Sequence, residues 1–63
     1  MTITGTRNGK QITLEVEVVS TSGNIRYVRK AGGAPLFGTT GYWRNGIIET
    51  YRGAVLLTDV TEA

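Results

Sequence analysis

Two Asn-Gly dipeptides constrain the fold of this chain more than any other feature of its sequence. Asn8-Gly9 and Asn45-Gly46 each lie between two segments in which apolar and polar residues alternate. Asn-Gly favours a type I′ turn, because both central residues of that turn need a positive φ, and such a turn joins two antiparallel strands. The sequence therefore predicts two tight β-hairpins.

The alternation around each turn predicts the register of its hairpin. Counting outward from Asn8-Gly9 places apolar residues on one face and threonines on the other, which suits a strand pair with one buried face. The pairs expected in the first hairpin are Ile3 with Leu14, Gly5 with Ile12, Thr4 with Thr13 and Thr2 with Glu15, and those expected in the second are Arg44 with Ile47, Trp43 with Ile48, Tyr42 with Glu49 and Thr40 with Tyr51.

The rest of the chain is also typical of short strands and turns. Its nine glycines separate segments rich in Thr, Val, Ile and Tyr, and no segment shows a helical period. A chain of 63 residues has room for one core only, so residues 1–63 are expected to form a single domain. Six strands are expected, at residues 2–7, 10–20, 25–30, 40–44, 47–51 and 54–60.

The predicted fold class is all-β: a small antiparallel meander of five or six strands that forms a barrel or a curled sheet. Its short strands and hairpins resemble the layout of small SH3-like barrels. An OB-fold fits less well. The helix that an OB-fold carries between its third and fourth strands would have to come from the glycine-rich segment 31–41.

The connection between the second and third strands carries no Asn-Gly signal. A four-residue loop at residues 21–24 would place Val18 opposite Tyr27 and Glu15 opposite Lys30. This register pairs an apolar residue with an aromatic one and an acid with a base, and both kinds of pair stabilise a sheet.

Two further local features are expected. The apolar alternation of the second strand is interrupted at Val19, which predicts a bend or a β-bulge near that residue. In the long loop at residues 31–41, Leu36 and Phe37 are expected to close one end of the core.

The two faces of the second hairpin differ from those of the first. A two-residue loop at Arg52-Gly53 would add one more strand, and Trp43 would then face the core, where burying its ring is a large hydrophobic gain. The expected core face is Trp43, Ile48, Val55 and Leu57, and the opposite face is Tyr42, Arg44, Ile47, Glu49, Tyr51, Ala54 and Leu56. Since this opposite face is largely aromatic and apolar, we expect another strand, a second copy of the chain or a ligand to cover it.

The composition argues against catalysis and metal binding. The chain contains no histidine and no cysteine, which are the commonest general acid–base group, the commonest low-pKa nucleophile and the commonest zinc ligands. Glu15 and Glu17 alternate along one strand as solvent-facing residues do. We therefore expect a protein that is not an enzyme and holds no metal and no cofactor.

Two functional classes remain. The first is a barrel that binds DNA or RNA, with basic residues on phosphates and tyrosines stacked on bases. The second is a structural or adaptor protein that packs on a copy of itself or on another protein. The nucleic-acid contacts expected are Arg26, Arg29, Lys30, Tyr42, Arg44, Tyr51 and Arg52, and the protein interface expected is Tyr42, Ile47, Tyr51 and Leu56.

Size and charge complete the expectations. A core this small, with no cysteine to cross-link it, favours stabilisation by self-association, so a homo-oligomer is expected. The formal charge of +2 gives only mild attraction to polyanions. No apolar segment approaches the length of a membrane span, and a soluble, cytoplasmic protein is expected.

Overall fold

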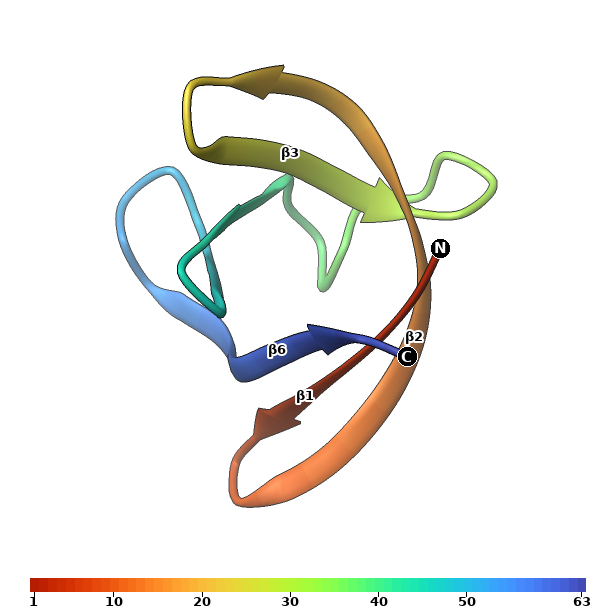
Figure 1. Cartoon of the computed structure of the whole chain (residues 1–63), viewed down its shortest axis with the longest axis vertical. Helices are drawn as coiled ribbons and strands as arrows, with labels where there is room; N and C mark the ends of the chain where they lie inside the picture. Colours follow the sequence, from red (N-terminus) through yellow and green to blue (C-terminus); the bar gives the residue numbers. More distant parts are fainter.

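Six antiparallel strands, joined in the order of the sequence, form a closed barrel (Figure 1). The computed structural model describes residues 1–63. The predicted all-β meander is confirmed, in its barrel form, and the architecture is consistent with a small SH3-like barrel. The chain forms no apolar helix of membrane-spanning length. The strands are β1 (Thr2–Arg7), β2 (Lys10–Ser22), β3 (Ile25–Lys30), β4 (Gly41–Arg44), β5 (Ile47–Glu49) and β6 (Val55–Glu62).

Strand β2 is long enough to serve two neighbours. Its first half, up to Glu15, pairs with β1, and its second half, from Val16 onward, pairs with β3. In Figure 1 this strand curves around one side of the barrel from the hairpin with β1 to the hairpin with β3. The curvature lets one strand belong to both parts of the barrel wall.

Both Asn-Gly hairpins have the predicted turn and the predicted register. The φ angles are 53° at Asn8 and 76° at Gly9, and 52° at Asn45 and 74° at Gly46, so both central residues have the positive φ of a type I′ turn. All the predicted pairs around the two turns are present, except that of Thr40. Pairing in the second hairpin stops at Tyr42 and Glu49 because β4 begins at Gly41 and β5 ends at Glu49.

The register predicted between β2 and β3 is wrong. The loop has two residues, Gly23 and Asn24, so that Ser22 pairs with Ile25. Gly23 has a φ of 59° and Asn24 does not have a positive φ, as in a type II′ turn, which has glycine at its first central position. The predicted irregularity near Val19 is confirmed, since the register shifts between Val18 and Ser20. As a result Val18 pairs with Val28, and Val16, not Glu15, pairs with Lys30.

Between β5 and β6, Thr50 and Ala54 are hydrogen-bonded and enclose a loop of three residues, 51–53, where two were predicted. The amide of Thr50 donates to the carbonyl oxygen of Ala54 at 2.8 Å, and the amide of Gly53 donates to the carbonyl oxygen of Thr50 at 2.9 Å. Val55 therefore lies opposite Glu49 and not opposite Thr50. Val55 is 54% exposed, so its predicted place in the core is wrong.

A bulge in β6 then restores the predicted pair of Leu57 with Ile48. The register shifts between Ile48 and Glu49, which leaves Leu56 as an extra residue of β6. Both Leu56 and Leu57 are buried, and the carbonyl oxygen of Leu56 accepts a hydrogen bond from Arg7 Nη1 at 3.0 Å. The prediction that Leu56 lies on the outer face with Tyr51 is wrong because of this bulge.

The core fills the barrel and is closed at one end by the loop that follows β3. Leu36 of this loop is fully buried, as predicted, whereas Phe37 is partly exposed and its ring lies under the guanidinium of Arg7, 4.2 Å from Cζ. Phe37 therefore covers Arg7 and does not fill the core. The buried apolar residues are Ile3, Val16, Val28, Leu36, Trp43, Ile48, Leu56, Leu57 and Val60.

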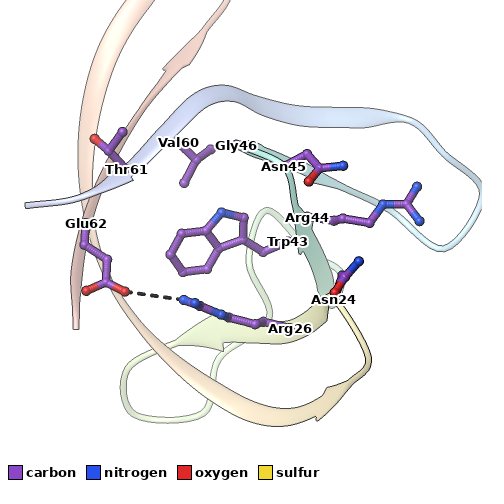
Figure 2. A pocket seen from close by; sticks show the side chains of 9 residues that line it. All are labelled: Asn24, Arg26, Trp43, Arg44, Asn45, Gly46, Val60, Thr61 and Glu62. Atoms are coloured by element: carbon purple, nitrogen blue, oxygen red, sulfur yellow. Dashed lines mark hydrogen bonds and ion pairs between the residues drawn. The ribbon is translucent and has the colours of Figure 1, made fainter.

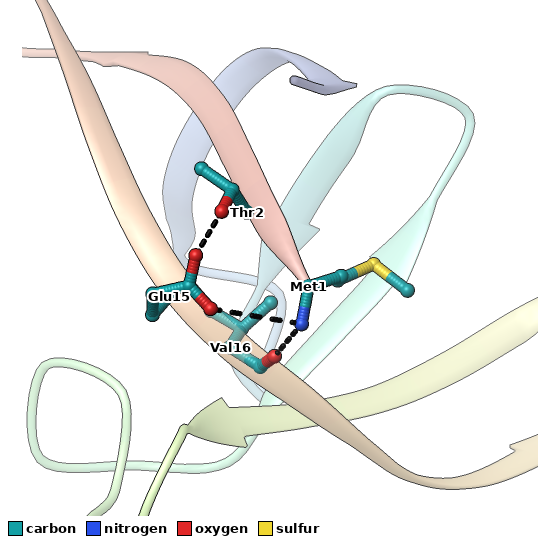
Figure 3. A network of polar contacts seen from close by, with 4 residues as sticks. All are labelled: Met1, Thr2, Glu15 and Val16. Atoms are coloured by element: carbon teal, nitrogen blue, oxygen red, sulfur yellow. Dashed lines mark hydrogen bonds and ion pairs between the residues drawn. The ribbon is translucent and has the colours of Figure 1, made fainter.

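The barrel closes where β6 returns to β1. The hydroxyls of Thr4 and Thr61 lie 3.0 Å apart, and the two chain ends lie side by side (Figure 1), with the amide of Ala63 donating to the carbonyl oxygen of Thr2 at 2.9 Å. Figure 3 shows how β1 is tied to β2 nearby: Thr2 donates to the carboxylate of Glu15, and the amine nitrogen of Met1 donates to the carbonyl oxygen of Val16 at 2.7 Å. These contacts leave no free sheet edge at the closure.

Candidate functional site

Three tyrosines follow one another across the outer surface of β3, β4 and the loop after β5. Tyr27 pairs with Tyr42 across β3 and β4, and their rings meet edge to face, with centroids 4.9 Å apart and planes at 86°. The ring of Tyr51 follows, with its centroid 6.1 Å from that of Tyr42. We call Tyr27, Tyr42 and Tyr51 the tyrosine row. Tyr51 at its end is 82% exposed.

A shallow cleft of about 250 Å³ lies at the end of the tyrosine row. Tyr42 and Tyr51 form one part of it, and Arg44 and Glu49 bring one positive and one negative charge. We call it the tyrosine cleft. Its lining residues are Ile25, Tyr42, Arg44, Glu49, Thr50, Tyr51 and Gly53.

A second, larger cleft of about 390 Å³ lies where the turns after β2 and β4 meet the last residues of β6 (Figure 2). Trp43 lies in its middle, and we call it the tryptophan cleft. Trp43 is only 8% exposed, as predicted for a core residue, so most of its ring is covered. The lining residues are Asn24, Arg26, Trp43, Arg44, Asn45, Gly46, Val60, Thr61 and Glu62.

Arg26 covers the tryptophan and is held from two sides. It pairs with Trp43 across β3 and β4, and its Cζ atom lies 4.8 Å from the centroid of the Trp43 ring, within the range of a cation–π contact. Its Nη1 also donates to Oε1 of Glu62 at 3.3 Å. Figure 2 shows Arg26 lying along the ring and reaching Glu62 beyond it.

Arg44 is the one residue that lines both clefts, and it has no ion-pair partner. It appears in the lining of the tryptophan cleft and of the tyrosine cleft, and its side chain extends away from Trp43 (Figure 2). The three ion pairs of the structure join Met1 with Glu15, Arg26 with Glu62, and Arg29 with Glu17. The charge of Arg44 is therefore available to a ligand of either cleft.

The structure brings four of the seven predicted nucleic-acid contacts to these two clefts. Tyr42, Tyr51 and Arg44 line the tyrosine cleft, and Arg26 and Arg44 line the tryptophan cleft. Arg52 lies beside Tyr51 in the loop after β5 and has no carboxylate partner. Arg29 and Lys30 line neither cleft, and Arg29 is paired with Glu17.

The predicted protein interface is only partly present on the surface. Tyr42, Ile47 and Tyr51 lie on the outside of the barrel, and Ile47 is 38% exposed. Leu56 is buried and does not belong to this surface. Val55, which was predicted to lie in the core, stands on this surface instead of Leu56, because the three-residue loop places it opposite Glu49.

Sequence reasoning missed several residues of these sites, among them Tyr27, Asn24, Ile25 and Glu62. The pairing of Tyr27 with Tyr42 joins β3 to β4 across the long connection at residues 31–40, which carries no turn signal that fixes a register. Asn24 lies in the two-residue turn after β2, and Ile25 follows it as the first residue of β3. Glu62 is joined to Arg26 by the closure of the barrel, which brings together residues 36 positions apart and leaves no local signal in the sequence.

No group of three or more acidic residues in the structure is arranged to hold a metal ion. Comparison of the chain with protein-family models, curated proteins and solved structures finds no match. A function can therefore be proposed only from the geometry of the tyrosine row and the two clefts.

Proposed function

We propose that this protein is a non-enzymatic module that binds single-stranded nucleic acid through the tyrosine cleft. The observation that carries the proposal is the tyrosine row, which runs from the half-buried Tyr27 and Tyr42 to the exposed Tyr51 and ends beside Arg44, an arginine with no carboxylate partner. Surfaces that bind single strands combine aromatic rings, on which bases stack, with positive charges along the backbone. Tyr51 and Arg44 are groups of these two kinds, and both are exposed.

The geometry favours a single strand over a duplex. A base can stack on Tyr51 only when the face of the base is free, and in a duplex both faces of an internal base are occupied by its neighbours. The contact depends on π-faces that all bases share, so a weak sequence preference is expected. Arg44 would bind the adjacent phosphate.

A homodimer formed through the same surface is a second candidate. Ile47, Tyr51 and Val55 are 38%, 82% and 54% exposed, and a two-fold interface needs only one self-complementary patch. Sedimentation equilibrium at micromolar concentration tests this candidate. A mass twice that of the chain, reduced by Tyr51→Glu, is the expected result, and a monomeric mass for the wild type excludes it.

The proposal of nucleic-acid binding is tested by fluorescence anisotropy with short labelled single strands of DNA and RNA at several salt concentrations. We expect saturable binding that weakens as salt rises, because phosphate contacts release counterions. Arg44→Ala should weaken binding and lower the salt slope by about 0.7, the value for one phosphate contact on a single strand.

Lys10→Ala is the matched control for Arg44→Ala. Lys10 is exposed, forms no ion pair and lies at the turn of the first hairpin, outside both clefts. The two variants have the same net charge, so a difference between them reports the position of the charge and not its amount. Equal effects of the two changes, or no binding by the wild type at low salt, would refute the proposal.

A further inference from the structure

The tryptophan cleft contains a flat cation whose orientation is fixed. Trp43 supports one face of the Arg26 guanidinium, and Glu62 holds its Nη1. The Arg26 side chain is nevertheless 45% exposed. A guanidinium that is supported on one face and open to solvent on another can receive a second planar group.

The surroundings of Arg26 suit a nucleobase. Nucleic-acid-binding proteins stack unpaired bases on arginine planes as well as on aromatic rings. The side-chain amides of Asn24 and Asn45 at the border of the cleft offer donors and acceptors to the edge of a base. The cleft volume of about 390 Å³ lies within the range of about 300–1,000 Å³ that is typical of small-molecule sites.

Arg44 links this cleft to the tyrosine cleft. Because its side chain lines both, a phosphate bound to Arg44 would lie between a base in one cleft and a base in the other. Neither cleft is lined by a residue of β1 or β2, so a single strand on this path would bind mainly outside the first hairpin.

We propose that the tryptophan cleft is a second base-binding site, in which a nucleobase stacks on Arg26 while Arg44 binds the phosphate that connects it to the base in the tyrosine cleft. Arg26 is then the stacking platform, and Trp43 and Glu62 position it. This inference rests on the proposed function and adds a second site to it.

Two arginines of β3 provide a matched test. Arg26 and Arg29 lie on the same strand, each side chain is 45% exposed, and each is paired with one glutamate. Substitution by lysine keeps the charge but removes the planar guanidinium. We expect Arg26→Lys to weaken binding of the labelled single strands about five- to tenfold, the lower part of the range for losing one stacked base, and Arg29→Lys to leave it unchanged.

Tryptophan fluorescence reports the second site independently. Trp43 is the only tryptophan and lies directly behind Arg26, so a base stacked there should quench its emission with the same midpoint as the anisotropy change. Excitation at a wavelength that tyrosine does not absorb restricts the signal to this cleft. If Arg26→Lys fails to fold, as thermal unfolding would show, the wild-type emission decides the question.

The outcomes separate this inference from the proposed function. Saturable anisotropy with an unchanged Trp43 emission overturns the second site and leaves the tyrosine cleft as the binding site. Equal affinities of folded Arg26→Lys and Arg29→Lys overturn the role of Arg26. Absence of saturable anisotropy with the wild type overturns the proposed function, and the second site with it.

Discussion

The two Asn-Gly hairpins of this barrel have the same turn and opposite kinds of outer surface. Both turns have two residues with positive φ, and both direct apolar residues into one core. The outer face of the β1–β2 hairpin is polar and is formed by Thr2, Thr4, Thr6, Gln11, Thr13 and Glu15. The outer face of the β4–β5 hairpin is formed by Tyr42, Arg44, Ile47 and Glu49.

Folding accounts for the polar outer face of the first hairpin but not for the aromatic outer face of the second. A threonine ladder satisfies strand propensity and solvent exposure together, and folding alone explains it. Folding does not require Tyr42 and Tyr51 on the outside, and adjoining aromatic rings on a surface are the feature on which the proposed binding rests. Both hairpins contribute to the core, and we propose that the second one also binds a ligand.

The largest expected effect is that of removing the core residue of the second hairpin. Trp43→Ala should cost about 3 to 5 kcal/mol in the free energy of unfolding, as buried aromatic truncations do, which is about all that a core of this size supplies. Urea denaturation measures the loss. Thr13→Ala, on the outer face of the first hairpin, should stay within about 0.5 kcal/mol, and a Trp43→Ala protein as stable as this control would contradict the core assignment.

Each hairpin has one inward glycine, and the two should respond differently to alanine. A Cβ at Gly41 would lie 2.7 Å from Ile48 Cγ2 and 3.0 Å from Val28 Cγ2, whereas a Cβ at Gly5 would meet nothing closer than 3.3 Å. Neither glycine has a positive φ, so the effect is steric.

We therefore expect Gly41→Ala to cost about 1 to 3 kcal/mol, as overpacking a core does. Gly5→Ala should cost less, since contacts at this distance relax with small shifts. Thermal unfolding of the two variants gives the order. A Gly5→Ala variant that is the less stable of the two would show that the first hairpin is packed more tightly than the structure indicates.

Tyr51→Ala should separate binding from stability. Because Tyr51 is almost fully exposed, its loss should leave the unfolding midpoint nearly unchanged while the affinity for a single strand falls by about 1 to 3 kcal/mol, the value of one stacked base. Anisotropy and thermal unfolding on the same samples measure both quantities. Unchanged affinity would remove Tyr51 from the binding surface.

The smallest expected effect comes from a carboxylate. Glu49 lines the tyrosine cleft without an ion-pair partner, so it would repel a phosphate bound at Arg44. Glu49→Gln should strengthen binding about two- to fivefold at low salt, and the gain should fade as salt screens the charges. Glu15→Gln, on the first hairpin, should have no such effect, and equal gains from both changes would show that only net charge matters.

The sequence was sufficient for the parts of the fold that local chemistry determines. Asn-Gly turns and strict alternation predicted both hairpin registers, the burial of Trp43 and the irregularity at Val19. The errors arose where the predicted length of a loop was wrong, by two residues after β2 and by one residue after β5. The two-residue loop at Gly23-Asn24 and the three-residue loop after Thr50 changed the pairs on either side of them.

The candidate site was predictable in composition but not in arrangement. Tyr42, Arg44 and Tyr51 were identified because they stand on the outward positions of a predicted hairpin. The contact of Arg26 with Glu62 depends on closure of the barrel between β6 and β1, and the burial of Leu56 depends on a bulge. Neither feature has a signature within a few residues of sequence.

The central claim, that the second hairpin and its surroundings bind single-stranded nucleic acid and the first hairpin does not, is tested most directly by amide chemical shifts during a titration with a short single strand. The predicted result is saturable shifts at Tyr27, Tyr42, Arg44 and Tyr51, with the amides of β1 and the first half of β2 unmoved. Shifts concentrated in the first hairpin, or none at any residue at low salt, would contradict the claim.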